Sequence, residues 1–186
     1  LANNLNLKWV DVVEDTCNMC LSDLKNKISP KTKIIILVHW GGNPIDLKKI
    51  EEIKEYSEKK YGFRPIIIED SAHAFGSEYK GQILSSIDND NIKVHSFQAI
   101  KHITSIDGGC IIFPDNILTK QAKLLRWYGI DRDDNTKDFR CENNISEWGF
   151  KFHMNDVNAT VGLENFKHAN EIISKHRENA QYYDIN

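Results

Sequence analysis

The sequence predicts an α/β domain built on a mostly parallel sheet with helices on both faces. Short, fully apolar runs of strand length alternate along the chain with segments of helical periodicity. The runs at 34–38 and 66–68 are apolar throughout rather than at every second position, which is typical of strands buried on both faces. The chain has 186 residues, which is long enough for one such domain with a sizeable core.

Composition and charge argue against several classes of protein. The chain has 24 Lys and Arg against 27 Asp and Glu, a formal net charge of −3, so nothing favours binding to nucleic acid or to an anionic membrane. The longest apolar runs, 34–38 and 66–68, are too short to span a bilayer, and no secretory signal opens the chain. We therefore expect a cytoplasmic protein with neither nucleic acid nor membrane as a partner.

The cysteines do not indicate a metal site. The spacing of the first two is that of a redox or zinc half-site, but no second half-site completes it. We expect all four to be reduced thiols, as in the cytosol: Cys17, Cys20, Cys110 and Cys141.

Strand and helix signals alternate in the first half of the chain. Strands are predicted at Lys33–Val38, Pro65–Glu69 and Ile92–Phe97. Between the first two, Asp46 is the predicted N-cap of a helix that ends at Gly62. Its apolar face has helical spacing: Leu47, Ile50, Ile53 and Tyr56.

The second half has a fourth strand and two further helices. The strand is Gly109–Phe113. Asp115 is predicted to cap a helix that ends at Gly129 and whose face comprises Ile117, Gln121, Leu124 and Tyr128. Asn155 or Asp156 is predicted to cap a last long helix, with a face of Ala159, Leu163, Phe166 and Ile173.

Two further expectations concern the long polar segment and the ends of the given sequence. The long polar segment 129–147 is interpreted as solvated surface, with a place near a substrate as the alternative. The chain begins at Leu1 and its last helical pattern has no stop signal, so we expect a piece of a longer protein.

Ligands of open α/β sheets bind at the carboxyl ends of the strands, so the residues there are the candidates for chemistry. Asp70 and His73 follow one strand, and Lys101 lies between the next strand and the Gly108-Gly109 pair. A lysine buried there as a cation is costly, but an imine formed with an aldehyde would change its charge. Taken singly, these residues also fit a turn-capping carboxylate, a loop histidine and a surface lysine.

Four motifs together resemble the DegT/DnrJ/EryC1/StrS family. They are EDSAHAFGSEYKG, SFQAIKHITSIDGG, PKTKIIILVHWGGNPIDLKKI and GFKFHMNDVNATVGLENF, and they run in family order from about Trp9 to Phe166. Members of this family are sugar aminotransferases that depend on pyridoxal 5'-phosphate. The resemblance implies their fold, the large domain of fold type I (aspartate-aminotransferase-like), present here incompletely.

The resemblance also implies the roles of the site residues. Lys101 stands where the family has the lysine that forms a Schiff base with the cofactor, and it would then move the proton. Asp70 stands where a carboxylate pairs with the pyridine nitrogen and keeps it protonated. His73 stands beside the cofactor ring and its phenolic oxygen, and Ser96 matches a hydroxyl that contacts the phosphate. In the segment that approaches the phosphate from a partner subunit, Lys151 replaces the family's asparagine and His153 its arginine.

The substrates and assembly that the resemblance implies are those of the whole family. The amino acceptor would be a nucleotide-linked keto sugar, the donor glutamate or glutamine, and the assembly a homodimer with shared active sites. Polysaccharide, antibiotic and lipid-linked pathways all use such products, and the sequence does not select among them.

The family's opening phosphate-binding segment and closing small domain have no counterpart in the sequence. We therefore assign residues 1–170 to the central and C-terminal part of the cofactor-binding domain. Residues 171–186 would begin the helix leading to the small domain. We expect this piece alone to bind cofactor poorly and to be inactive.

Three other functions stay open at this level. A related sugar dehydratase uses the same cofactor but has His in place of the lysine, and His102 adjoins Lys101. A non-catalytic α/β binding module would leave Asp70, His73 and Lys101 without a role. A dinucleotide-binding domain is disfavoured because no G-x-G-x-x-G follows any predicted strand.

Overall fold

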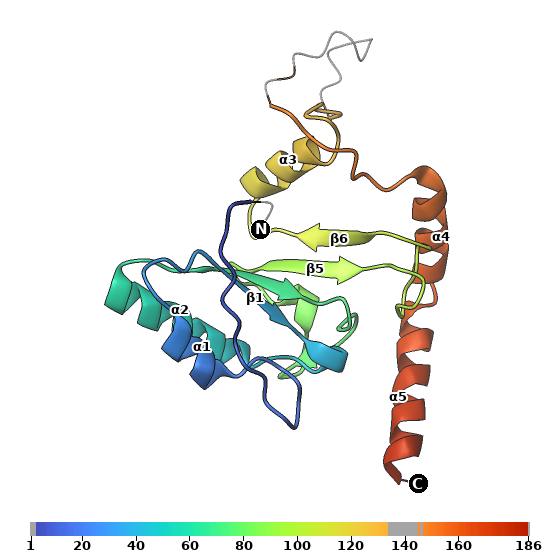
Figure 1. The fold of residues 1–186 in the computed structure, drawn as a ribbon. Helices are drawn as coiled ribbons and strands as arrows, with labels where there is room; N and C mark the ends of the chain where they lie inside the picture. Colours follow the sequence, from blue (N-terminus) through green and yellow to red (C-terminus); the bar gives the residue numbers. More distant parts are fainter. Residues whose placement is uncertain (1–2, 134–144, 146, 186) are drawn as a thin grey trace.

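The computed structural model describes residues 3–133, 145 and 147–185 and contains a four-stranded sheet with the order β1-β2-β5-β6. Strands β1 (Ile34–Val38), β2 (Ile66–Asp70) and β5 (Ile92–Ser96) are parallel, and β6 (Gly109–Ile112) runs antiparallel to β5 (Figure 1). Each strand lies within one residue of its predicted bounds. The prediction of a mostly parallel α/β sheet is thus confirmed.

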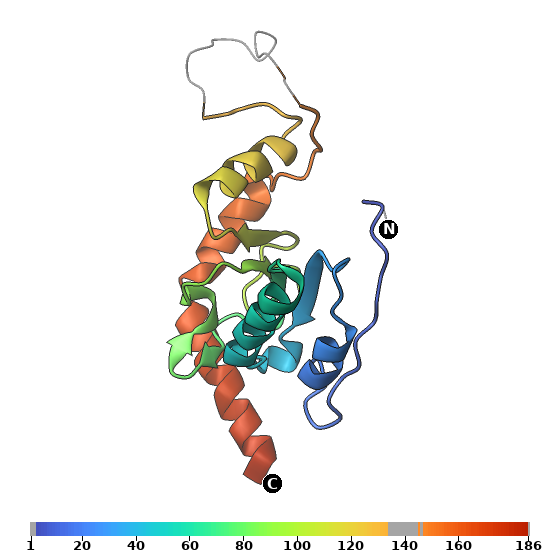
Figure 2. The ribbon, with the colours of Figure 1, turned by 90° about the vertical axis from the view of Figure 1, so that its left-hand side faces the viewer.

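The helices lie on different sides of the molecule. Helix α2 lies across the sheet with α1 beside it, whereas α4 and α5 run along another side of the molecule (Figure 2). The bounds are α1 (Leu21–Lys27), α2 (Leu47–Tyr61), α3 (Asn116–Leu125), α4 (Asp156–Phe166) and α5 (Ala169–Ile185). The remaining short elements are η1 (Trp40–Gly42), β3 (Glu78–Tyr79), β4 (Gln82–Ile83) and η2 (Leu84–Ser86).

Helix α2 is capped as its sequence predicts. The Asp46 side chain accepts hydrogen bonds from the N–H groups of Lys48 and Lys49, and Gly62 ends the helix in the left-handed conformation (φ 78°). The apolar face of α2 packs with α1 against β1 and β2. This core comprises Leu24, Ile28, Ile35, Leu37, Ile45, Ile50, Ile53 and Ile67.

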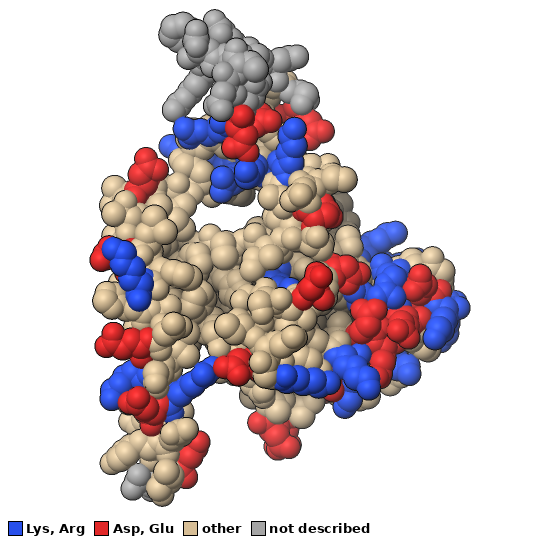
Figure 3. Space-filling view, turned by 180° about the vertical axis from the view of Figure 1, so that it is seen from behind, with Lys and Arg blue, Asp and Glu red and all other residues tan. Residues whose placement is uncertain are grey.

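The opposite face of the sheet is apolar but open among the described residues. Ile36 and Ile66 are more than half exposed, at 57% and 51%, although they lie within strands. Seen from behind, the molecule carries its charged side chains mostly toward its sides and few across its middle (Figure 3), a view that does not single out either face of the sheet. Within this chain α1 and α2 therefore cover one face, as expected of an incomplete domain.

Two helix predictions were wrong in extent. The predicted single helix after Asn155 is interrupted, because the N–H groups of Lys167 and His168 turn back to carbonyls three residues earlier. A new helix, α5, begins at Ala169. Helix α3 ends at Leu125 rather than Gly129, although the Gly129 N–H still donates to the Leu124 carbonyl (2.9 Å).

Some predictions fall outside the described residues. These are Cys141 and residues 134–144 of the polar 129–147 segment. Cys17, Cys20 and Cys110 are free thiols. In the described part of the chain, no helix has both the length and the apolar character that crossing a membrane requires.

Candidate active site

Asp70 and Ser96 share one face of the sheet at its carboxyl edge. Asp70 is the last residue of β2 and pairs in register with Val94 of the neighbouring β5. Side chains alternate between faces along a strand, so Ser96, two residues beyond Val94, lies on the same face as Asp70. Residue alternation and parallel pairing therefore bring together two side chains that are 26 positions apart in the sequence.

The Asp70 carboxylate is half-buried and only partly engaged. Its Oδ1 accepts a hydrogen bond from the Ala72 N–H (3.0 Å). Among the described residues, no hydrogen bond or ion pair involves Oδ2. One carboxylate oxygen thus stays available for a donor brought by a ligand.

Lys101 lies on a loop that leaves the same edge of the sheet. The loop is closed at its base, because the Phe97 N–H donates to the Gly108 carbonyl (2.8 Å) and the Ser105 N–H to the Phe97 carbonyl (2.9 Å). The Lys101 side chain is half-buried, and its Nζ forms no ion pair or hydrogen bond with any described residue. An amine without a carboxylate partner is available for reaction with an aldehyde.

His73 and Lys101 lie near a common neighbour, His102. Burial, followed by the nearby His176, His73 and Lys101, lowers the pKa of the His102 imidazole. The His102 ring also meets the His176 ring of α5 edge-on, with centroids 4.6 Å apart. The segments after β2 and β5 and helix α5 therefore converge at this edge.

Lys151 lies on a different segment of the chain. It pairs as an isolated bridge with Trp127, just after α3. Asp70, His73, Ser96 and Lys101 thus lie on segments at the carboxyl edge of the sheet, whereas Lys151 pairs with the segment after α3.

Two residues that the sequence analysis did not single out fix the backbone of Asp70. His39 and Glu69 are fully buried on the other face of the sheet, with His39 Nε2 3.0 Å from Glu69 Oε2. His39 Nδ1 accepts from the Ile45 N–H (3.1 Å), so Nε2 carries the proton and donates to Glu69. The His39 N–H donates to the Asp70 carbonyl (3.1 Å), which ties β1 to the carboxyl end of β2.

Glu69 is held as a carboxylate by these contacts. Burial opposes its ionisation, but hydrogen bonds from His39 and Asn91 (2.7 Å) outweigh burial and hold the pKa of Glu69 below its usual range. Removing the side chain would leave both donors buried without a partner.

Glu69→Ala should lower the free energy of unfolding of the full-length protein by about 3–5 kcal/mol in chemical denaturation. The exposed Glu55→Ala control should change it by less than about 0.5 kcal/mol, and equal effects would contradict this role.

His95 makes the fold sensitive to acid. It is buried on β5, and burial together with the nearby His39 lowers the pKa of its imidazole. The unfolded chain therefore binds the proton more readily, so stability present above about pH 6.5 declines as the pH falls toward the lowered pKa. The free energy of unfolding should fall between pH 7.5 and 5.5, and His95→Gln should reduce that fall. The same change at the exposed His168 should not, and an unchanged pH dependence in His95→Gln would contradict the account.

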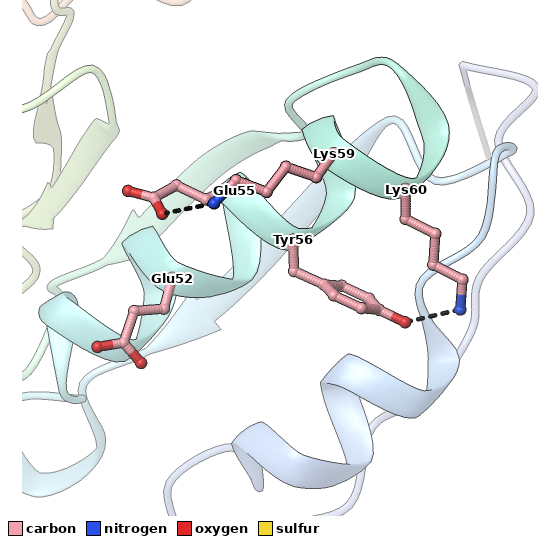
Figure 4. Close-up of a pocket in the computed structure, with 5 residues that line it drawn as sticks. All are labelled: Glu52, Glu55, Tyr56, Lys59 and Lys60. Carbon is pink, nitrogen blue, oxygen red and sulfur yellow. Dashed lines mark hydrogen bonds and ion pairs between the residues drawn. The ribbon is translucent and has the colours of Figure 1, made fainter.

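One surface hollow lies along α2, away from this edge of the sheet. The hollow along α2 is lined by the side chains of Glu52, Glu55, Tyr56, Lys59 and Lys60 (Figure 4). Lys60 donates to the Tyr56 hydroxyl (2.7 Å), and Lys59 pairs with Glu55 at 3.8 Å. These two pairs lie on the exposed surface of the helix.

The fold and site define a class of protein. The carboxyl edge of this α/β sheet carries a free amine and a carboxylate with one open oxygen, together with an imidazole and a hydroxyl. Such a set of groups suits an aldehyde-bearing heterocyclic cofactor. A model of the DegT/DnrJ/EryC1/StrS aminotransferase family matches residues 1–186, and the chain belongs to this family. The resemblance seen in the sequence motifs is thereby confirmed.

Solved structures agree with this assignment. AtS13 from Actinomadura melliaura is 47% identical with a TM-score of 0.90, and the match covers 98% of this chain and 48% of that one. The sugar aminotransferase CalS13 from Micromonospora echinospora is 39% identical with a TM-score of 0.87, over 98% and 48%. Spr1654 from Streptococcus pneumoniae, in its PLP form, is 28% identical with a TM-score of 0.81, over 94% and 46%. The chain thus spans about half the length of these proteins.

Proposed function

We propose that the full-length protein is a pyridoxal-phosphate-dependent aminotransferase. It would transfer an amino group from glutamate or glutamine to a nucleotide-linked keto sugar. The observation that carries this proposal is the position of two side chains at the carboxyl ends of adjacent strands. Lys101, whose amine has no partner among the described residues, lies on the loop after β5, and Asp70, with one open oxygen, ends β2. Family membership and the sugar aminotransferases among the solved relatives support the reaction class.

The residues at this edge fit the chemical groups of pyridoxal phosphate. Lys101 offers the amine for the aldehyde, and Asp70 offers an anionic oxygen for the protonated pyridine nitrogen. Among the residues that the structure describes, the Ser96 Oγ accepts only from the Gln98 N–H (3.3 Å), so its own proton is free to donate to a phosphate. The Trp40 ring meets the His73 ring edge-on, with centroids 5.2 Å apart, and helps to fix the imidazole.

When bound, the cofactor supplies an electron sink for a carbanion. Residues of this chain would orient the cofactor and move the proton. Asp70 would hold a proton on the ring nitrogen by ion pairing in a half-buried site, which keeps the ring electron-withdrawing. Lys101, once displaced by the incoming amine, would carry the proton between carbon atoms as a general base and acid.

Lys151 is the residue through which a partner subunit would contribute to the site. We propose a homodimer in which Lys151 of one protomer approaches the cofactor phosphate of the other, as a point charge. In support, apolar side chains are exposed on α3, α4 and the segment that carries Lys151. They are Ile117, Trp148, Phe152, Val157 and Leu163, each at least 69% exposed.

We also propose where the protein is located in the cell and how the chain divides into domains. We place the protein in the cytoplasm, where thiols such as Cys17 and Cys20 stay reduced. We assign residues 1–170 to the cofactor-binding domain and 171–186 to the start of a helix toward a small domain.

Residues 1–186 expressed alone should bind cofactor poorly and lack activity. A stable cofactor absorbance with turnover of a keto sugar would contradict this.

The test of function is product analysis with the full-length protein. It is incubated with pyridoxal phosphate, glutamate or glutamine, and a panel of nucleotide-linked keto sugars. An amino sugar with stoichiometric keto acid from the donor supports the proposal. A product that has lost a hydroxyl group indicates a dehydratase, and no turnover with an intact fold indicates a binding module.

A further inference from the structure

We propose that one face of helix α4, formed by Asn158, Gly162 and Asn165, positions the loop that carries Lys101 for the reaction. This inference rests on the proposed aminotransferase function and adds positioning residues to it. Figure 1 shows α4 and α5 one below the other beside the carboxyl ends of the strands, where this loop lies.

The loop has a rigid base and a more exposed tip. At the base, Ser105 is almost completely buried, and its hydroxyl donates to the Asp107 carbonyl (2.8 Å). The Thr104 hydroxyl donates to the Phe97 carbonyl (3.2 Å) and accepts from the Ile106 N–H (2.9 Å). Lys101 lies between Phe97 and this base, so a shift of residues 104–108 would move its amine.

Helix α4 holds that base through two side-chain amides. Asn165 Nδ2 donates to the Thr104 carbonyl (2.9 Å), and Asn158 Nδ2 donates to the Asp107 carbonyl (3.2 Å). The two asparagines are seven positions apart, which is two turns, so they lie on one side of the helix. Both amides therefore bind carbonyl oxygens of the same short turn, one on each side of Ser105.

Gly162 lies between these two asparagines and permits the close contact. A Cβ built on it would lie 3.0 Å from the Ser105 Cβ and 3.7 Å from the Ser105 Cα. Ser105 cannot easily move away, because its N–H and its hydroxyl are both bonded within the loop. Glycine in the middle of a helix is unfavourable, so its presence here is explained by the approach of this backbone.

The same side of α4 also contacts the segment that follows Asp70. The Phe166 ring meets the Phe75 ring edge-on at 6.1 Å, and Phe75 meets Phe97 at 6.5 Å. Helix α4 thus contacts both segments that bear the proposed chemistry. Its position sets the separation between the Lys101 amine and the Asp70 carboxylate.

The test uses two substitutions in the full-length enzyme, Gly162→Ala and Asn165→Asp. The first adds a methyl group against Ser105, and the second keeps the shape but turns an oxygen toward the Thr104 carbonyl. Each should lower kcat about tenfold, because displacement by a fraction of an ångström misaligns the reacting groups, while KM for the sugar changes less than about twofold. The pH midpoint of the bound-cofactor absorbance should shift. For Gly162→Ala, Tm should change little, because the gain in helix propensity offsets the cost of the contact with Ser105.

The matched control is Asn170→Ala, an exposed asparagine on α5, which should behave as the wild type. If Gly162→Ala and Asn165→Asp both retain the wild-type kcat and pH midpoint, α4 is only a packing surface and the inference is overturned. A loss of Tm that accounts for the lost activity in both variants would also overturn it. If the wild-type enzyme forms no covalent cofactor adduct on Lys101 after borohydride reduction, the proposed function itself fails, which is a separate result.

Discussion

Replacing Lys101 with alanine in the full-length protein is expected to abolish transamination. The Lys101 amine is the only group on the loop after β5 that can both bind the cofactor covalently and move the proton. Loss of a covalent catalytic group costs on the order of 10³-fold or more in kcat. Steady-state turnover of glutamate and a keto sugar measures this loss, and far-ultraviolet circular dichroism checks the fold.

The control for this substitution is Lys120→Ala on α3, where the side chain is 72% exposed. It should leave turnover unchanged. A Lys101→Ala protein that retains more than about a tenth of wild-type turnover would show that another residue performs these steps. His102, the adjacent residue, is the first to test in that event.

Asp70→Asn is expected to have the second-largest effect. Asparagine keeps an oxygen for the Ala72 N–H, so the local turn is preserved while the negative charge is removed. Loss of an opposite charge lowers the pKa of a paired cation by about 1–3 units, equivalent to roughly 1.4–4 kcal/mol. Turnover should therefore fall by about 10- to 1000-fold with the cofactor still bound.

The comparison for Asp70→Asn is the same change at the exposed Asp88, which should be neutral. Cofactor binding is followed by its absorbance, so that lost affinity and lost turnover are separated. Equal turnover of Asp70→Asn and wild type would mean that the ring nitrogen does not depend on this carboxylate.

Local signals in the sequence were sufficient for most of the fold. The caps of α2 and α3 are residues whose side chains bond to the first turn, Asp46 and Asp115, and both act as predicted. The strands are short apolar runs that need only burial, and they were placed within one residue. The break between α4 and α5 was missed because Lys167 and His168 carry no Gly or Pro signal, and the turn is made by backbone bonds.

The position of the candidate residues at the edge of the sheet could be predicted from the strands, whereas their tertiary contacts could not. Asp70 and Lys101 follow strands, so topology alone places them at one edge. The role of Glu69 was missed, because its partner His39 is 30 residues away and the pair forms only when β1 and β2 align. The bonds of Asn158 and Asn165 likewise depend on how α4 docks, and only Gly162 within a helical pattern hinted at a close approach.

The central claim is that the Lys101 amine and the Asp70 carboxylate serve one cofactor ring. Borohydride reduction of the full-length protein with pyridoxal phosphate, followed by peptide mass mapping, tests it most directly. The account predicts a single pyridoxyl modification on Lys101, with a weakened absorbance band of the protonated cofactor in Asp70→Asn before reduction. Modification at another lysine, or none in a folded protein, would contradict it.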